Sequence, residues 1–192
     1  MQGYRVWFDR LLSVITGLIV VTVAYFVMTE RVIPALKGET VRVWRGERLP
    51  EVLEFASLDR GGDNRERPRV HIPNRRATLM LVFNSTCQAC YRTLPAWRRA
   101  VAAAADDGVT VLAVGLDPDQ RGAAEYARQN LPAAAVVAPE DPVRFTNMLG
   151  VDVVPFTALL DADGVLLFAR QGSLNAQAGD SLIRALGALV GS

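Results

Sequence analysis

Two cysteines, Cys87 and Cys90, are the residues of this sequence whose type and spacing can do chemistry, and the chain has no other cysteine. A thiolate can attack a disulfide sulfur to form a mixed disulfide, which a second nearby thiol then resolves. The two cysteines flank Gln88 and Ala89, so the second lies about one helical turn beyond the first. Dithiol–disulfide exchange requires this spacing.

The cysteines lie where an apolar run gives way to a helical pattern. Residues 78–84 (TLMLVFN) predict a buried strand, and residues 88–105 predict a helix in which Pro95 introduces a kink. This junction places Cys87 at the N-terminus of the helix. Unpaired N–H groups and the positive end of the helix dipole favour a thiolate at that position.

The rest of the chain predicts an α/β domain. The expected elements are strands at 40–45 and 70–72, the strand and helix around the cysteines, a strand at 109–115, a helix at about 119–130, a strand at 135–138, a helix from Asp141-Pro142 to Gly150, strands at 155–161 and 165–169, and a helix at 175–190. Strands joined through helices should be parallel, and the last two should form an antiparallel hairpin. The predicted fold class is therefore α/β, a mixed sheet with helices on both faces.

Composition excludes several classes of function. The 192 residues are 51% hydrophobic, enough for one globular domain and a short additional segment. A formal net charge of +1 supplies no basic field for nucleic acid. The two cysteines and the single histidine, His71, are fewer than the four ligands of a structural zinc site. We therefore predict no metal, no cofactor and no nucleic-acid partner, and we interpret His71 as a surface residue rather than a ligand or proton donor.

Residues 11–28 (LLSVITGLIVVTVAYFVM) form an apolar segment of 18 residues without a charged side chain. A helix of this length spans roughly 27 Å, close to the hydrocarbon thickness of a bilayer. The segment predicts an uncleaved membrane anchor; a cleaved signal peptide and a buried core helix are the alternatives. The expected organisation is a cytoplasmic stub (1–10), a transmembrane anchor (11–29) that contacts lipid through Leu11–Met28, a tether (30–39) and a folded domain (40–192).

The orientation of this anchor does not follow from charge alone. Two arginines precede the segment, and Arg31 and Lys37 follow it, so the positive-inside rule gives an even count. A short N-terminal stub before a large C-terminal domain is the usual layout of a signal anchor. We therefore expect a single-pass protein of the cell membrane with its C-terminal domain outside the cytoplasm, a location that suits a dithiol pair.

Five placements make the sequence resemble a known family. They are the strand ending in Phe83-Asn84, the Cys87-Gln88-Ala89-Cys90 motif, Pro95 in the following helix, the segment GVDVVP at 150–155 and the segment LLDADG at 159–164. With them, residues 49–189 resemble thioredoxin-fold proteins, and more narrowly the membrane-anchored TlpA/ResA-like thiol–disulfide oxidoreductases. The residues around the motif are also similar to those of the MauD-type branch, which is associated with methylamine dehydrogenase maturation.

The resemblance implies roles for four residues. Cys87 would be the attacking thiol and Cys90 the resolving thiol. Pro155 would be a cis-proline facing the dithiol, and Val154 before it would offer backbone hydrogen bonds to an extended substrate. The alternatives are an ordinary trans proline at the start of a strand and a pair of inert buried thiols.

The sequence also departs from the family pattern near the dithiol. Thr86 stands where a tryptophan is frequent, and Thr93 and Leu81 stand where related proteins carry a glutamate and an aspartate. A buried carboxylate can accept the proton of the resolving thiol, so proton transfer here needs water or another group. Asp117 and Glu125 are candidates that the sequence alone does not place.

These observations predict a membrane-tethered thiol–disulfide oxidoreductase that acts on protein substrates with disulfides or thiols. The resemblance implies reduction of selected client proteins, such as apocytochrome c, with a membrane electron-donor protein that restores the dithiol. The opposite direction stays open, because a strongly stabilised Cys87 thiolate would make the reduced form the stable one and the protein an oxidant. Two other classes stay open. The domain could deliver copper, although its cysteines are CxxC and its histidine lies upstream, or it could be a redox-inactive scaffold for assembly of a membrane or periplasmic complex.

Overall fold

The structure is a computed structural model that describes residues 15–23, 25, 46–49, 52–59, 68–73, 75–106 and 108–190. Its contacts divide the chain into two compact units, residues 1–39 and 40–192, and the second unit contains both cysteines. The strand expected at 40–45 lies outside the described residues.

The described elements of the second unit follow the predicted order from the strand that precedes the cysteines onward. They are β1 (Leu53–Ser57), β2 (Arg69–Ile72), β3 (Thr78–Phe83), α3 (Gln88–Asp106), β4 (Thr110–Gly115), α4 (Gln120–Asn130), β5 (Ala135–Pro139), α5 (Pro142–Leu149), β6 (Phe156–Leu160), β7 (Leu166–Gln171) and α6 (Ala176–Val190). From β3 onward each predicted end lies within two residues of the observed one. The sequence did not predict β1, and this strand is the main correction to the expected fold.

The strands form one mixed sheet in the order β2-β1-β5-β4-β3-β6-β7. The strands joined through α3 and α4 are parallel, as expected, because β4 pairs in parallel with both β3 and β5. The hairpin of β6 and β7 is antiparallel, also as expected. The unpredicted β1 pairs antiparallel with β5 and with β2, and so extends the sheet beyond its parallel centre.

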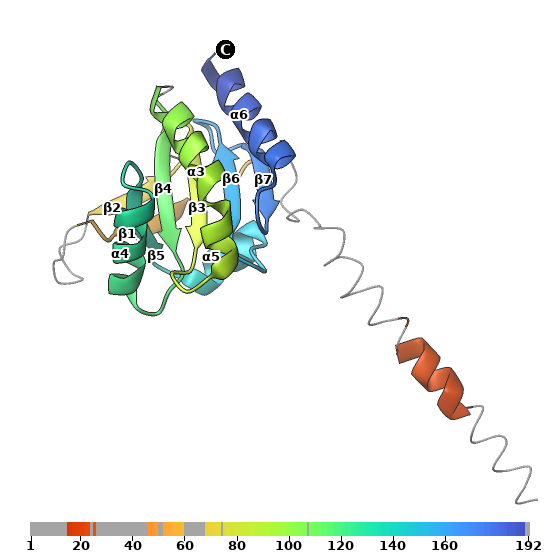
Figure 1. The fold of residues 1–192 in the computed structure, drawn as a ribbon. Helices are drawn as coiled ribbons and strands as arrows, with labels where there is room; N and C mark the ends of the chain where they lie inside the picture. Colours follow the sequence, from red (N-terminus) through yellow and green to blue (C-terminus); the bar gives the residue numbers. More distant parts are fainter. Residues whose placement is uncertain are drawn as a thin grey trace, which may run out of the picture. The chain divides into compact units, whose positions relative to one another are not determined.

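Helices cover both faces of this sheet, which confirms the predicted layers (Figure 1). On one face α3, α4 and α6 bury apolar side chains against alternate residues of β3, such as Leu79 and Leu81. On the other face Phe145 and Leu149 of α5 pack with side chains from β1, β3 and β6. The side chain of Trp97 in α3 is fully buried, and its indole Nε1–H donates a hydrogen bond to Thr157 Oγ1 over 2.8 Å.

Local sequence signals set the helix ends that were predicted. Asp119 caps α4 by accepting a hydrogen bond from the Arg121 N–H, and Asp141 caps α5 by accepting one from the Arg144 N–H. Gly150 ends α5 in the left-handed conformation, with φ of 62°, which glycine adopts without the steric cost of a Cβ atom.

In the N-terminal unit, residues 15–23 and Tyr25 are helical. Among the residues that the structure describes, no helix has the length and apolar character needed to cross a membrane. The predicted anchor (11–29) extends beyond these described residues at both ends, and the predicted stub and tether lie entirely outside them. The anchor therefore stays a prediction.

The hydrogen bond between Trp97 and Thr157 predicts a measurable effect on stability. A Thr157→Val substitution keeps the shape of the side chain but leaves the buried indole N–H without its acceptor, which costs about 1–3 kcal/mol. We expect the free energy of unfolding in urea to fall by that amount. In a Trp97→Phe background the same substitution should cost much less, because no donor is left unpaired. An equal cost in both backgrounds would show that the hydrogen bond does not contribute.

Candidate active site

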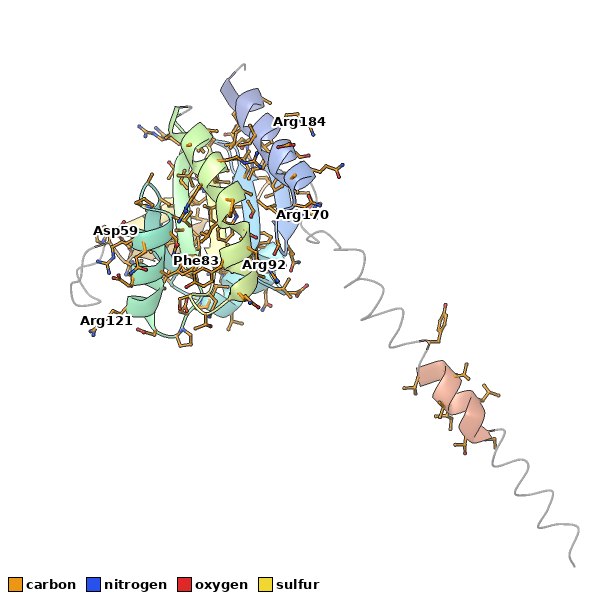
Figure 2. The ribbon with its side chains drawn as sticks, in the orientation of Figure 1. Asp59, Phe83, Arg92, Arg121, Arg170 and Arg184 are labelled. Atoms are coloured by element: carbon orange, nitrogen blue, oxygen red, sulfur yellow. The ribbon has the colours of Figure 1, made fainter. Side chains whose placement is uncertain are left out.

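The candidate site begins where β3 ends and α3 starts. The turn between them is closed by Asn84, whose side-chain Oδ1 accepts hydrogen bonds from the N–H and the hydroxyl of Thr86. Its backbone oxygen accepts a hydrogen bond from the Cys87 N–H over 3.0 Å. Figure 2 labels Phe83, the last residue of β3, and Arg92 in α3, which precede and follow this turn in the sequence. Cys87 therefore immediately precedes the first helical residue, as the sequence predicted.

The two thiols differ in exposure. Both cysteines are free; Cys87 is half-buried, whereas Cys90 is fully buried. The backbone N–H of Cys90 donates a hydrogen bond to Cys87 Sγ over 3.2 Å. A donor at this position stabilises negative charge on the Cys87 sulfur. Cys87 is thus the sulfur that a partner can reach, and Cys90 lies directly behind it.

The environment of Cys90 raises the pKa of its thiol. Burial raises the pKa of the Cys90 thiol from 9.0 to about 12, with further contributions from its hydrogen bond to Cys87 and from the nearby charges of Cys87 and Asp117. A backbone hydrogen bond at Asn84 acts in the opposite direction but is outweighed. At neutral pH Cys90 is therefore a thiol.

Val154, which directly precedes Pro155, lies against Cys87, although it is more than 60 residues away in the sequence. The peptide bond between them is cis, so the alternative of a trans proline is wrong. The Cys87 thiol donates a hydrogen bond to the Val154 backbone oxygen over 3.7 Å. The structure thus brings the four predicted site residues together, while their roles in a reaction stay predictions.

Of the two carboxylates that the sequence left unplaced, Asp117 lies at the site. It follows the end of β4, and its two oxygens accept hydrogen bonds from the Ser85 N–H at 2.9 and 3.0 Å. The Ser85 hydroxyl also donates to it. Glu125 is exposed on α4 and contacts Arg128 and Gln129. Asp117 therefore holds the turn that precedes Cys87, and its charge acts on Cys90.

A glycine allows α4 to approach this corner closely. A Cβ atom at Gly115, the last residue of β4, would lie 2.7 Å from the Cβ of Ala123 in α4. Real Cβ atoms essentially never come that close, so a larger residue would push α4 outward. This contact matters for the site because α4 carries Tyr126, whose ring stacks on Phe83 with a centroid distance of 4.8 Å.

The two positions at which the sequence departs from the family pattern that it resembles carry no carboxylate. Leu81 and Thr93 are both fully buried, and the Thr93 hydroxyl donates to the Ala89 backbone oxygen. Tyr126 packs edge-to-face against Tyr91, and its buried hydroxyl has no hydrogen-bond partner among the described residues. Burial raises the pKa of Tyr126 as well, so its phenol is neutral near neutral pH.

His71 lies far from the dithiol in the order of the sheet. It is exposed in β2, at one edge of the sheet, and its Nδ1 lies 3.8 Å from Glu54 Oε1 on the neighbouring β1. The part of the chain that the structure describes holds no group of three or more histidine, cysteine, aspartate or glutamate residues that could bind a metal ion.

Comparisons with known proteins identify the fold. No protein-family model matches the chain, and no curated protein sequence matches it. Among solved structures, a putative thiol:disulfide interchange protein DsbE from Chlorobium tepidum is 21% identical with a TM-score of 0.60, over 77% of this chain and 99% of that one. StoA from Bacillus subtilis is 18% identical with a TM-score of 0.54, over 72% and 98% of the two chains.

A third similar structure is a putative protein disulfide isomerase from Bacteroides thetaiotaomicron, which is 13% identical with a TM-score of 0.64, over 80% of this chain and 94% of that one. These structures, together with the thioredoxin domain of a Bacteroides vulgatus oxidoreductase, show that the chain has a thioredoxin-like fold. At these identities the similarity establishes the fold alone. The CxxC pair of Cys87 and Cys90 is present in this chain.

The different environments of the two thiols predict a difference in their alkylation. At pH 7.5 iodoacetamide should modify Cys87 in the reduced protein and leave Cys90 unmodified. Because the pKa of Cys90 is raised to about 12, its reaction rate should increase about tenfold per pH unit up to that value. Mass spectrometry of peptides from a pH series measures both sites, and denatured protein, in which both cysteines react, is the control. Equal modification of both thiols at pH 7.5 would contradict this assignment.

Proposed function

We propose that the protein is a thiol–disulfide oxidoreductase that acts on disulfides of other proteins through Cys87 and Cys90. The observation that carries this proposal is the reachable Cys87 sulfur, which accepts the Cys90 N–H and lies against the backbone of Val154. The names of several similar structures, which describe thiol:disulfide interchange proteins, support the same reaction class.

The reaction proceeds in two exchanges. The Cys87 thiolate attacks one sulfur of a client disulfide, so that a Cys87–client disulfide forms and the other client sulfur leaves as a thiolate that takes up a proton. Cys90 then loses its proton and attacks Cys87 Sγ, which releases the second client thiol. The client disulfide has been reduced by two electrons, and Cys87 and Cys90 have been oxidised to a disulfide.

Because the pKa of Cys90 is raised, the second exchange requires the loss of a proton from Cys90. Burial is the largest cause of the raised pKa of Cys90, so loss of its proton accompanies its attack on the mixed disulfide. The first client thiolate to leave is a base close to the site. This client thiolate takes up a proton from the solvent, and the proton that Cys90 loses passes to water. Neither exchange requires a protein carboxylate at the positions of Leu81 or Thr93.

The backbone at Val154 offers a place for an extended client segment. Such a segment would lie beside Val154 and exchange main-chain hydrogen bonds with it, as a strand added to an edge does. Val153 (55% exposed) directly precedes Val154, and Tyr91 (49% exposed) donates its backbone N–H to the Cys87 backbone oxygen. These exposed apolar side chains favour clients with apolar residues beside their cysteines.

The proposed location and partners depend on the sequence. The apolar segment at 11–28 supports a tether in the cell membrane with the domain outside the cytoplasm. In that compartment the oxidised protein would need a membrane electron-donor protein to return to the dithiol form. We propose reduction of client proteins, such as apocytochrome c, as the direction of the reaction.

Substitution of each cysteine tests the mechanism. Cys87→Ser should lower the rate of reduction of a disulfide-bonded peptide at least 100-fold, because the attacking sulfur is lost. Cys90→Ser should instead accumulate a mixed disulfide between Cys87 and the peptide, which mass spectrometry under non-reducing conditions detects. Cys87→Ser protein that works as well as wild type in cells would contradict the proposal and favour a scaffold.

The reduction potential of the Cys87–Cys90 pair tests the direction of the reaction. We expect a value near or below about −220 mV, towards the thioredoxin end of the known range, from equilibration with a glutathione or dithiothreitol series. A value near −120 mV would describe an oxidant and contradict the proposed direction. Failure of the two cysteines to form a disulfide at all would contradict the oxidoreductase function itself, and a Cu(I) titration would then test copper delivery.

A further inference from the structure

We propose that Gln171 is a positioning residue that holds the loop before Pro155 in the shape that a client segment binds. This inference rests on the proposed function and identifies the residue that prepares its binding surface. Gln171 is the last residue of β7, and it pairs across the ladder with Phe156, the residue after the cis-proline.

The side chain of Gln171 makes hydrogen bonds to three backbone groups of one loop. Its Oε1 accepts from the N–H of Asp152 over 3.1 Å and from the N–H of Val153 over 3.0 Å. Its Nε2 donates to the backbone oxygen of Gly150 over 2.8 Å. One amide side chain thus uses both acceptor directions of its oxygen and one donor of its nitrogen on the same segment.

The hydrogen bonds of Gln171 hold the exposed middle of a loop whose two ends are held by other bonds. The loop starts at the end of α5, where the Val151 N–H donates to the Thr146 backbone oxygen. It ends at Pro155, whose backbone oxygen accepts the Gly172 N–H over 2.7 Å. Between these two ends Asp152 and Val153 are exposed, so burial does not hold them, and Gln171 supplies their hydrogen bonds.

This arrangement determines which backbone groups a client can use. The N–H groups of Asp152 and Val153 are occupied by Gln171 and do not compete for the client's carbonyl oxygens. Val154, the next residue, then keeps its backbone oxygen at Cys87 Sγ. A preformed loop binds an extended segment without first paying the entropy of ordering, so its loss weakens binding rather than chemistry.

Three variants separate hydrogen bonding from packing. Gln171→Met keeps the approximate length and volume of the side chain and loses all three bonds, and Gln171→Ala loses both the bonds and the volume. Gln177→Ala, at an exposed glutamine on α6, is the matched control. For each reduced protein we would measure kcat and KM with a disulfide-bonded peptide, and the rate with 5,5′-dithiobis(2-nitrobenzoic acid), a small disulfide that does not need the loop.

We expect KM for the peptide to rise roughly tenfold in both Gln171 variants, with kcat and the rate with the small disulfide within about twofold of wild type. The control should match wild type throughout. A wild-type KM in Gln171→Met would overturn the inference, as would an equal loss with both disulfides. Absence of any reaction in the wild-type protein would contradict the proposed function instead.

A measurement on the unaltered protein decides the inference even if the Gln171 variants do not fold. Amide hydrogen exchange of the wild-type protein reports on the N–H groups of Asp152 and Val153 separately. We expect both to exchange at least tenfold more slowly than in an unstructured peptide, because each is bonded to Gln171 Oε1. Exchange at the rate of an unstructured peptide would overturn the proposed role.

Discussion

The central position of β3 is the constraint on which the rest of the site depends. All six of its residues are buried, and it is hydrogen-bonded on one side to β4 and on the other to β6. Phe83 pairs with Gly115 at the end of β4, and Val82 pairs with Phe156 at the start of β6. The adjoining ends of three neighbouring strands, at the carboxyl ends of β3 and β4, therefore bring the dithiol, Asp117 and the cis-proline loop together. A shift of β3 by one residue would exchange its two buried faces and displace all three.

The protonation of Cys90 at this site is determined more by burial than by charge. Cys90 has no exposed surface, and desolvation is the largest cause of its raised pKa. Asp117 lies at the site, but its oxygens accept the hydrogen bonds of Ser85, so it acts as a support of the turn. With Leu81 and Tyr126 in the same core cluster, the Cys90 thiol has apolar surroundings. In the proposed reaction, its attack would therefore follow the formation of a mixed disulfide at Cys87 Sγ.

The sequence predicted those parts of the fold that local interactions determine. Asp119 begins α4 through a hydrogen bond to a near neighbour, and Gly150 ends α5 through its own left-handed dihedral angles, so both helix ends were predicted correctly. The strand β1 was missed because only two of its five residues, Leu53 and Phe55, are buried, and its place depends on pairing with the distant β5. Gln171 was missed for a related reason: it is a single polar residue at a strand end, and the loop that it binds lies up to 21 residues earlier.

In the proposed reaction, the contrast in exposure between the two sulfurs would also determine how long a client stays attached. Only Cys87 can be reached from outside, so every covalent adduct forms on the same atom and cannot migrate to a second docking position. Departure then depends on an internal event, the approach of a buried neighbour, and not on a further collision. The lifetime of the complex would therefore depend on the packing of the protein core. Substitutions that loosen or tighten the packing around Cys90 would change this lifetime without altering the surface that the client contacts.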